Sequence, residues 1–370
     1  MDSNDLKTYF RENFSLRGEL GASVSVWQNG AEIVGIADGW REKEQANTWD
    51  KQTLVPVYSA TKGPASATLL HVLDRHGLTA ETPVGEVWPA FPLPAASFAE
   101  MISHQCGLAA LDETADVFDH AAVIAAVEKQ KPEWVPGEGH GYHPRTFGFL
   151  LDECVRRLDG RSLGEVWNAD IAAPAGIDFW IGLHESEWGR VAKLVPGRAK
   201  ASAFEQGFYE SFNTPGSLTR RAFSSPRGLH AIAEMNSPKA WAAGLPAMGG
   251  VGSAGGLAKF YQLAIGAMAG PLSEGVMKSL REMQSTAEDK VLLRETAFTC
   301  GCQKDPVDSE GNKKRFLYGK STAAFGHPGA GGSHGFGDPE SGLSFAYVMN
   351  QMELSVMPGE RCMGLVERLP

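Results

Sequence analysis

The chain has 370 residues, of which 43% are hydrophobic, and it carries a formal net charge of −10. A chain of this length can form about two units of roughly 100–200 residues each, with a substantial buried core. The acidic balance, with no lysine- or arginine-rich run, excludes an electrostatic footprint for nucleic acid, and no apolar stretch approaches the roughly 20 residues that a membrane span requires.

The first 80 residues combine helix and strand patterns. The amino terminus lacks the basic-then-apolar pattern of a signal peptide, so we expect a soluble, cytoplasmic protein. Residues 4–13 predict a short helix, and the segments 22–27 and 31–36 predict a hairpin around an Asn-Gly turn. A short buried segment at 54–58 leads into a helix over 64–73, where apolar residues recur with helical spacing.

The middle of the chain is mainly helical, and strand patterns return near its end. The segments 121–127, 147–158 and 257–265 all have helical apolar spacing. Short β-favouring segments bounded by turns predict strands at 298–303, 315–319, 324–327 and 343–350, before a last helix from about 360 to 369.

These patterns predict an α+β fold whose antiparallel sheet, flanked by helices, is built from both ends of the chain. Residues 1–78 and 290–370 form the predicted sheet domain. Residues 79–289 form an inserted, mainly helical domain, and the active site is expected in the cleft between the two.

Three further patterns indicate structure rather than chemistry. The glycine pattern Gly250-Val-Gly-Ser-Ala-Gly255 follows a poor strand, so it favours a tight turn with Ser253 capping the next helix over a dinucleotide site. Cysteines and histidines lack metal-ligand spacing, so we expect reduced structural thiols and neither a metal nor a cofactor. The residues concerned are Cys106, Cys154, Cys300, Cys302, Cys362, His140, His143, His327 and His334.

The segment Ser59-Ala-Thr-Lys62 is the strongest chemical signal. It places a potential nucleophile and a potential base one helical turn apart on the same face. A serine hydroxyl needs a neighbour that removes its proton, and a lysine at this spacing can do so once it has lost its own proton. The proline at position 64, just inside the following helix, supports a helix start here, where backbone N–H groups favour negative charge.

Two glycine-rich segments join this pair. The loop 134–143 can hold the hydroxyl of Tyr142 at the mouth of a cleft. The segment 325–339 lets a substrate approach strand backbone closely, as an oxyanion hole requires.

With these motifs, and with the stretches 101–108 and 179–187, the chain resembles the serine β-lactamase and penicillin-binding-protein superfamily. The resemblance is to its class C-like esterase branch, the family VIII carboxylesterases, and it runs nearly end to end. It implies a β-lactamase-like fold in which Ser59 is acylated and Lys62 and Tyr142 share its proton. It also implies that the backbone N–H groups of Ser59 and Ala330 hold the oxyanion.

The sequence departs from the β-lactamase pattern at the positions implied to bind substrate. His327-Pro-Gly329 stands in place of Lys-Thr-Gly, and His143-Pro144 follows the tyrosine in place of x-Asn. A largely neutral histidine binds a carboxylate less well than a permanent cation does. His327, Gly329 and His143 therefore indicate a small-molecule ester substrate without an obligatory carboxylate.

The sequence thus predicts a serine hydrolase, namely a carboxylesterase that acts on small or medium acyl esters. A transacylase, or a β-lactamase or D-amino-acid peptidase, would use the same site, and a non-catalytic binding protein could keep the fold. Specificity is expected from loops near 200–250 and 304–314, where residues 204–212 carry several aromatic side chains. The natural ester and the oligomeric state stay open.

Overall fold

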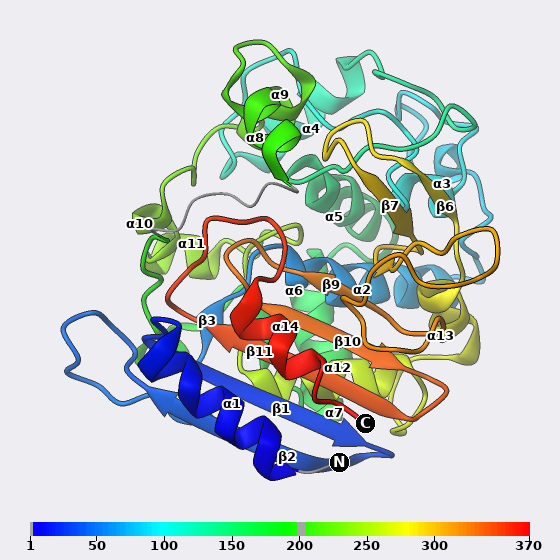
Figure 1. The fold of residues 1–370 in the computed structure, drawn as a ribbon. Coiled ribbons are helices and arrows are strands. Elements are labelled where there is room, and N and C mark those ends of the chain that lie inside the picture. The colour runs from blue at the N-terminus through cyan, green and yellow to red at the C-terminus, as the bar shows by residue number, and fades with distance from the viewer. Residues whose placement is uncertain (1–2, 198–204) are drawn as a thin grey trace.

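The computed structural model describes residues 3–197 and 205–370. Its centre is an eight-stranded antiparallel sheet in the order β2-β1-β11-β10-β9-β8-β7-β6, to which both ends of the chain contribute (Figure 1). The predicted α+β fold is therefore confirmed. The strands are β1 (Gly21–Gln28), β2 (Ala31–Gly39), β6 (Ser285–Glu288), β7 (Glu295–Phe298), β8 (Gln303–Lys304), β9 (Phe325–Pro328), β10 (His334–Asp338) and β11 (Leu343–Met349).

Helices cover the sheet. The helix α12 (Ala254–Ala264) packs against β1, β10 and β11, whereas α1 (Ser3–Leu16) and α14 (Glu360–Val366) pack together over the near face in Figure 1. The Ser253 side chain caps α12 by accepting a hydrogen bond from the Gly256 N–H at 3.0 Å, as the sequence predicted.

The remaining helices make up the helical part of the structure. They are α2 (Lys62–Arg75), α3 (Phe98–Ile102), α4 (His120–Lys129), α5 (Thr146–Asp159), α6 (Leu163–Val166), α7 (Ala173–Ala175), α8 (Gln206–Asn213), α9 (Leu218–Ser224), α10 (Ile232–Met235), α11 (Pro238–Ala242) and α13 (Glu274–Arg281). The helices α3, α4, α5, α8 and α9 lie in the upper part of Figure 1, and α10 and α11 lie at its left. The helix α2 contacts α5, α13 and α6 as well as β9. Within the described ranges, no helix has the length and apolar character needed to span a membrane.

A second, three-stranded sheet joins distant parts of the chain. It has the order β3-β5-β4 and is antiparallel, with β3 (Val55–Pro56) and β4 (Phe179–Ile181) on either side of β5 (Gly250–Gly252). Because β3 ends just before Ser59, this small sheet fixes the backbone that enters the Ser-x-x-Lys turn.

The predicted helices 4–13, 64–73, 121–127, 147–158 and 257–265 all form, as α1, α2, α4, α5 and α12, and the predicted hairpin forms as β1 and β2. Two predicted strands are wrong. Residues 299–302 form the turn between β7 and β8, and residues 315–319 are a loop. In that loop the N–H groups of Leu317 and Tyr318 donate to the Asp305 carboxylate, at 3.1 Å each, instead of to a neighbouring strand.

The division into residues 1–78 with 290–370, and 79–289, stays a prediction. Two elements inside the predicted helical insert belong structurally to the main sheet: β6 is its edge strand, and α12 packs on its face.

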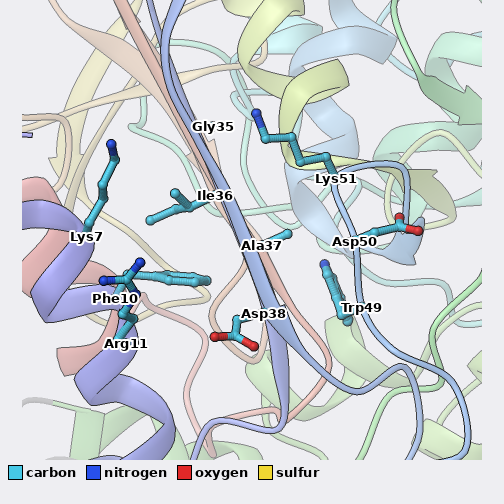
Figure 2. Close-up of a pocket in the computed structure, with 10 residues that line it drawn as sticks. All are labelled: Lys7, Phe10, Arg11, Gly35, Ile36, Ala37, Asp38, Trp49, Asp50 and Lys51. Atoms are coloured by element: carbon cyan, nitrogen blue, oxygen red, sulfur yellow. The ribbon is translucent and has the colours of Figure 1, made fainter.

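The other edge of the sheet, β2, carries a cavity of about 420 Å³ (Figure 2). Lys7 and Arg11 of α1 lie on one side of this strand, and Lys51 lies on the other. Charged side chains along an edge strand hinder pairing with another chain. This cavity contains none of the residues predicted to form the active site, since those lie on β9 and in the helical part.

Candidate active site

Ser59 lies in a one-turn 3₁₀ helix, Ser59–Thr61, that runs directly into α2. The preceding residue, Tyr58, has φ 49° and ψ −129°, a conformation that non-glycine residues seldom adopt and that often marks functional turns. Thr61 secures the turn: its hydroxyl donates to the Tyr58 carbonyl and accepts a hydrogen bond from the Gly250 N–H at 2.9 Å.

The ammonium position of Lys62 is fully buried beneath Ser59. Its Nζ lies 2.8 Å from the Ala247 carbonyl oxygen, 3.1 Å from the Pro144 carbonyl oxygen and 3.4 Å from Ser59 Oγ. A neutral amine has two hydrogens and one lone pair. Because the two carbonyls accept both hydrogens, the lone pair is left for the Ser59 hydroxyl.

The surroundings of Lys62 favour this neutral form. Burial, reinforced by the positive charge of Arg145, holds the pKa of Lys62 well below its usual value. Arg145 is itself buried, and it donates through Nε to the Pro226 carbonyl at 3.0 Å. Among the described residues, no carboxylate forms a hydrogen bond or salt bridge with Lys62 Nζ that would offset the cost of a buried ammonium.

Tyr142 faces Ser59 from the glycine-rich loop before α5. Its hydroxyl interacts with the Ser59 side chain, which acts to lower the pKa of the phenol, and Lys62 Nζ lies 4.8 Å from the centre of its ring. The ring stacks on Phe298 of β7, with 6.2 Å between ring centroids and 6° between planes. The fold therefore brings Tyr142 to the Ser59–Lys62 pair, although Tyr142 lies far from both in the sequence.

Burial raises the pKa of Tyr142, and its interaction with Ser59 offsets only part of this effect. Burial thus acts in opposite directions on the two groups, so that an uncharged phenol beside an uncharged amine is the resting state. In this state the group ready to accept a proton from Ser59 is Lys62.

Ser59 and Tyr142 open onto a narrow cavity of about 30 Å³, between β9 and the helical part. Ala330 also lines it, in the turn after β9. The N–H groups on either side of Ala330 are used within the protein: Gly329 donates to Ser333 O at 2.6 Å, and Gly331 donates to Ser355 O at 2.9 Å. These bonds fix the turn and hold Ala330 against the cavity.

Gly329 was predicted to bind substrate, but it is not among the residues that line the cavity. Its role is in the backbone packing of the turn. A Cβ at this position would lie 2.0 Å from the carbonyl oxygen of Val57. Glycine therefore lets the β9 turn approach the chain that leads to Ser59.

His327 lines the cavity and is buried. Its Nδ1 donates to the Pro328 carbonyl at 2.7 Å, which leaves Nε2 without its proton, 3.5 Å from Nε2 of Gln303. Burial lowers the pKa of His327 to about 3. The histidine therefore offers the cavity an acceptor, not a cation.

His143 is not brought to the cavity. Its Nδ1 donates to the Gly141 carbonyl at 2.7 Å, and its Nε2 accepts from the Leu108 N–H at 2.9 Å. Both ring nitrogens are thus occupied by backbone groups, and burial lowers the pKa of this side chain to about 3. His143 ties the Tyr142 loop to residue 108, a role that local sequence did not reveal.

Sequence reasoning missed several residues of the cavity. Gln303 and Arg294 add polar groups, whereas Phe223 of α9 adds an aromatic wall that Phe208 of α8 backs, with 5.3 Å between ring centroids. Of the predicted aromatic segment 204–212, no described residue lines the cavity, and residue 204 lies outside the described residues. Among the described residues, none from 304–314 lines the cavity either.

The arrangement supplies the parts of acyl transfer. It places a hydroxyl next to a neutral buried amine, a phenol that can relay a proton, and a turn whose N–H groups can face an oxyanion. An α+β fold that places Ser59, Lys62 and Tyr142 together beside β9 is typical of one class of protein. This class is the serine hydrolases built on the β-lactamase fold.

Comparison with known proteins places the chain within that class. The sequence profile of the beta-lactamase family matches residues 9–361, nearly the whole chain. The chain therefore belongs to the beta-lactamase family.

Three relatives illustrate the range of this family. The esterase/beta-lactamase LipL of Mycobacterium tuberculosis (strain ATCC 25618 / H37Rv) is 28% identical over 367 residues, covering 93% of this chain and 80% of LipL. The crystal structure of a penicillin-binding protein homologue from Caulobacter crescentus has a TM-score of 0.85 and 29% identity, over 98% of this chain and 95% of that chain. The crystal structure of a family VIII carboxylesterase has a TM-score of 0.85 and 28% identity, with the same coverage of both chains.

Proposed function

We propose that this protein is a carboxylesterase that hydrolyses small or medium acyl esters through an acyl-enzyme on Ser59. The observation that carries the proposal is the buried Lys62 amine, whose two carbonyl partners leave its lone pair for Ser59 Oγ, 3.4 Å away. A catalytic contact of this kind is often long in the resting enzyme and shortens when substrate binds.

In the proposed reaction, Ser59 attacks the ester carbonyl while Lys62 takes up the hydroxyl proton. The backbone N–H groups of Ser59 and Ala330 stabilise the oxyanion of the tetrahedral intermediate. Tyr142 gives its phenol proton to the departing alkoxide. In deacylation the resulting tyrosinate takes a proton from the attacking water, and Lys62 returns its proton to Ser59 Oγ as the acid leaves. If an alcohol replaces this water, the same intermediate yields a new ester.

The lining of the cavity supports an apolar acyl group. Six of the residues around it are apolar, namely Phe223, Leu292, Pro328, Ala330, Val356 and Met357. The names of the esterase and carboxylesterase relatives agree with an ester substrate. The relatives also include a penicillin-binding protein homologue, and Arg294 places a guanidinium at the cavity, which keeps a β-lactamase or D-amino-acid peptidase as the alternative.

The ratio of kcat/KM for a p-nitrophenyl butyrate ester to that for a chromogenic cephalosporin tests the substrate class. Because neutral His327 stands where a β-lactamase has a lysine, we expect the ester to be favoured by about 10-fold or more. A cephalosporin value equal to or above the ester value would contradict the proposal. Loss of both activities in Ser59→Ala shows that the two reactions share one site.

A further inference from the structure

The turn between β6 and β7 contains a carboxylate with no exposed surface, Asp289. Both of its oxygens accept the backbone N–H of Tyr142, at 3.0 and 3.1 Å. Oδ1 also accepts the N–H groups of Val291 and Leu292 at 2.8 Å each, and Oδ2 accepts the Thr296 hydroxyl at 3.1 Å. The carboxylate is thus surrounded by donors.

Two of these donors belong to the turn itself, but Tyr142 lies 147 residues earlier in the chain. The turn is already closed by hydrogen bonds between the backbones of Asp289 and Arg294 and of Leu293 and Asp289, both at 2.9 Å. The contact with Tyr142 is therefore an addition that joins the hairpin to the glycine-rich loop. A second link runs beside it, from the Lys290 N–H to the His140 carbonyl at 3.1 Å.

These N–H and O–H groups satisfy the oxygens of the Asp289 carboxylate. His140 Nε2 lies 4.0 Å from Oδ2, and Arg294 also interacts electrostatically with Asp289. Because the Thr296 hydroxyl donates to Asp289, it accepts from His140 Nε2, while Nδ1 accepts from Ser285 Oγ, each at 2.7 Å. Burial lowers the pKa of His140, which agrees with a neutral ring.

We propose that Asp289 is a positioning residue that holds the Tyr142 hydroxyl against Ser59 by anchoring the Tyr142 backbone to the β6–β7 hairpin. This inference rests on the proposed esterase function. The same hairpin also carries Phe298, on which the Tyr142 ring stacks. Backbone and ring are therefore both fixed by one element, and the flexible glycines at 137, 139 and 141 do not set the position of the phenol.

The negative charge of Asp289 also acts on the Tyr142 hydroxyl, whose pKa it helps to raise after the larger effect of burial. Removing this charge lowers the pKa of Tyr142, whereas a purely mechanical anchor would not change it. Among the described residues, the other charged or titratable side chains around Tyr142 are Lys62, Arg294 and the imidazoles of His104, His143 and His327. The Ser59 hydroxyl also faces it.

The test is Asp289→Asn in the full chain, assayed with a p-nitrophenyl ester. The amide keeps an oxygen for the N–H groups of the turn but loses the second acceptor and the charge. We expect kcat to fall by about 10²-fold, with KM changed much less. Because Tyr142 acts while protonated, we also expect the descending limb of the pH–rate profile to move to lower pH. Wild-type kcat with an unshifted profile would overturn the proposal, as would a lower melting temperature without loss of kcat.

Two further comparisons separate positioning from general damage. Asp338→Asn alters another largely buried carboxylate, which caps the Glu340 and Ser341 N–H groups at the β10–β11 turn, so it should leave kcat unchanged. If Asp289→Asn does not fold, Thr296→Val removes one donor to Asp289 and should lower kcat, and Thr296→Ser should restore it. Equal kcat in the Val and Ser variants would contradict the proposal.

Labelling of Ser59 by a fluorophosphonate distinguishes this inference from the function on which it rests. If the wild type is not labelled, the proposed esterase function fails. If the wild type is labelled and Asp289→Asn is labelled at the same rate, the function stands and the role of Asp289 is refuted. We expect a labelled wild type and slower labelling of the variant.

Discussion

Replacement of Lys62 by methionine is expected to lower kcat for ester hydrolysis by about 10²–10⁴-fold, the usual contribution of a general base. Methionine fills the buried volume of the lysine stem but has no lone pair placed to receive the Ser59 proton. The wild-type pH–rate profile should rise well below the usual pKa of lysine, because burial keeps the Lys62 amine neutral. A methionine variant that retains wild-type kcat would contradict the role proposed for Lys62.

The dependence of stability on pH gives a control that needs no substrate. The folded-state pKa of Lys62 lies below its unfolded value of about 10.4. The unfolded chain therefore binds more protons between these two values, and the free energy of unfolding rises with pH in this window. Lys62→Met should flatten this rise in denaturant titrations made from neutral pH to pH 10. An unchanged slope would mean that Lys62 is protonated in the folded protein.

Replacement of Tyr142 by phenylalanine is expected to have the second large effect. The variant keeps the ring that stacks on Phe298 and keeps the backbone N–H bonded to Asp289, so the fold should be preserved. Only the hydroxyl that contacts Ser59 is lost. Because this group serves in proton transfer, kcat should fall by about 10²–10⁴-fold while the melting temperature changes little.

The measurement is a pair of kcat values and melting curves for wild type and Tyr142→Phe. His143→Gln is a useful control, since His143 lies next in sequence but its ring nitrogens bond to backbone groups of the Tyr142 loop and of residue 108. It should lower stability more than Tyr142→Phe does. Near wild-type kcat in the phenylalanine variant would exclude the phenol from the proton path.

Local sequence was sufficient to predict the Ser59 and Lys62 part of the site. Their spacing of three residues places both on one face of a helix start, whatever the rest of the chain does. The protonation state of the Lys62 amine could not be predicted from local sequence in the same way. It depends on the carbonyls of Pro144 and Ala247, which lie 82 and 185 residues away.

Two of the predictions that were wrong share a physical cause. The segment 315–319 has strand-like composition, but the Asp305 carboxylate accepts two of its N–H groups and so removes them from any ladder. His143 was predicted to bind substrate from its place after Tyr142, yet its ring turns into the protein and bonds to backbone. In both cases a side-chain-to-backbone hydrogen bond decides the outcome, and composition does not reveal such a bond.

The position of the Tyr142 side chain could not be predicted from local sequence patterns. The resemblance to family VIII carboxylesterases identified Tyr142, but its position depends on Asp289 and Phe298, on a hairpin that no local pattern connects to residue 142. The three-stranded sheet that supports Ser59 could not be predicted from local patterns either, because each of its strands has only two or three residues. Pairings this short and this distant are set by tertiary packing.

The intact mass of the protein after brief exposure to a fluorophosphonate, compared between wild type and Ser59→Ala, tests the central claim most directly. An activated Ser59 predicts a single adduct on the wild type and none on the variant, with both proteins folded. No adduct on either folded protein would contradict the account, because it would mean that Lys62 and Tyr142 do not activate Ser59 and that the fold serves a non-catalytic binding role.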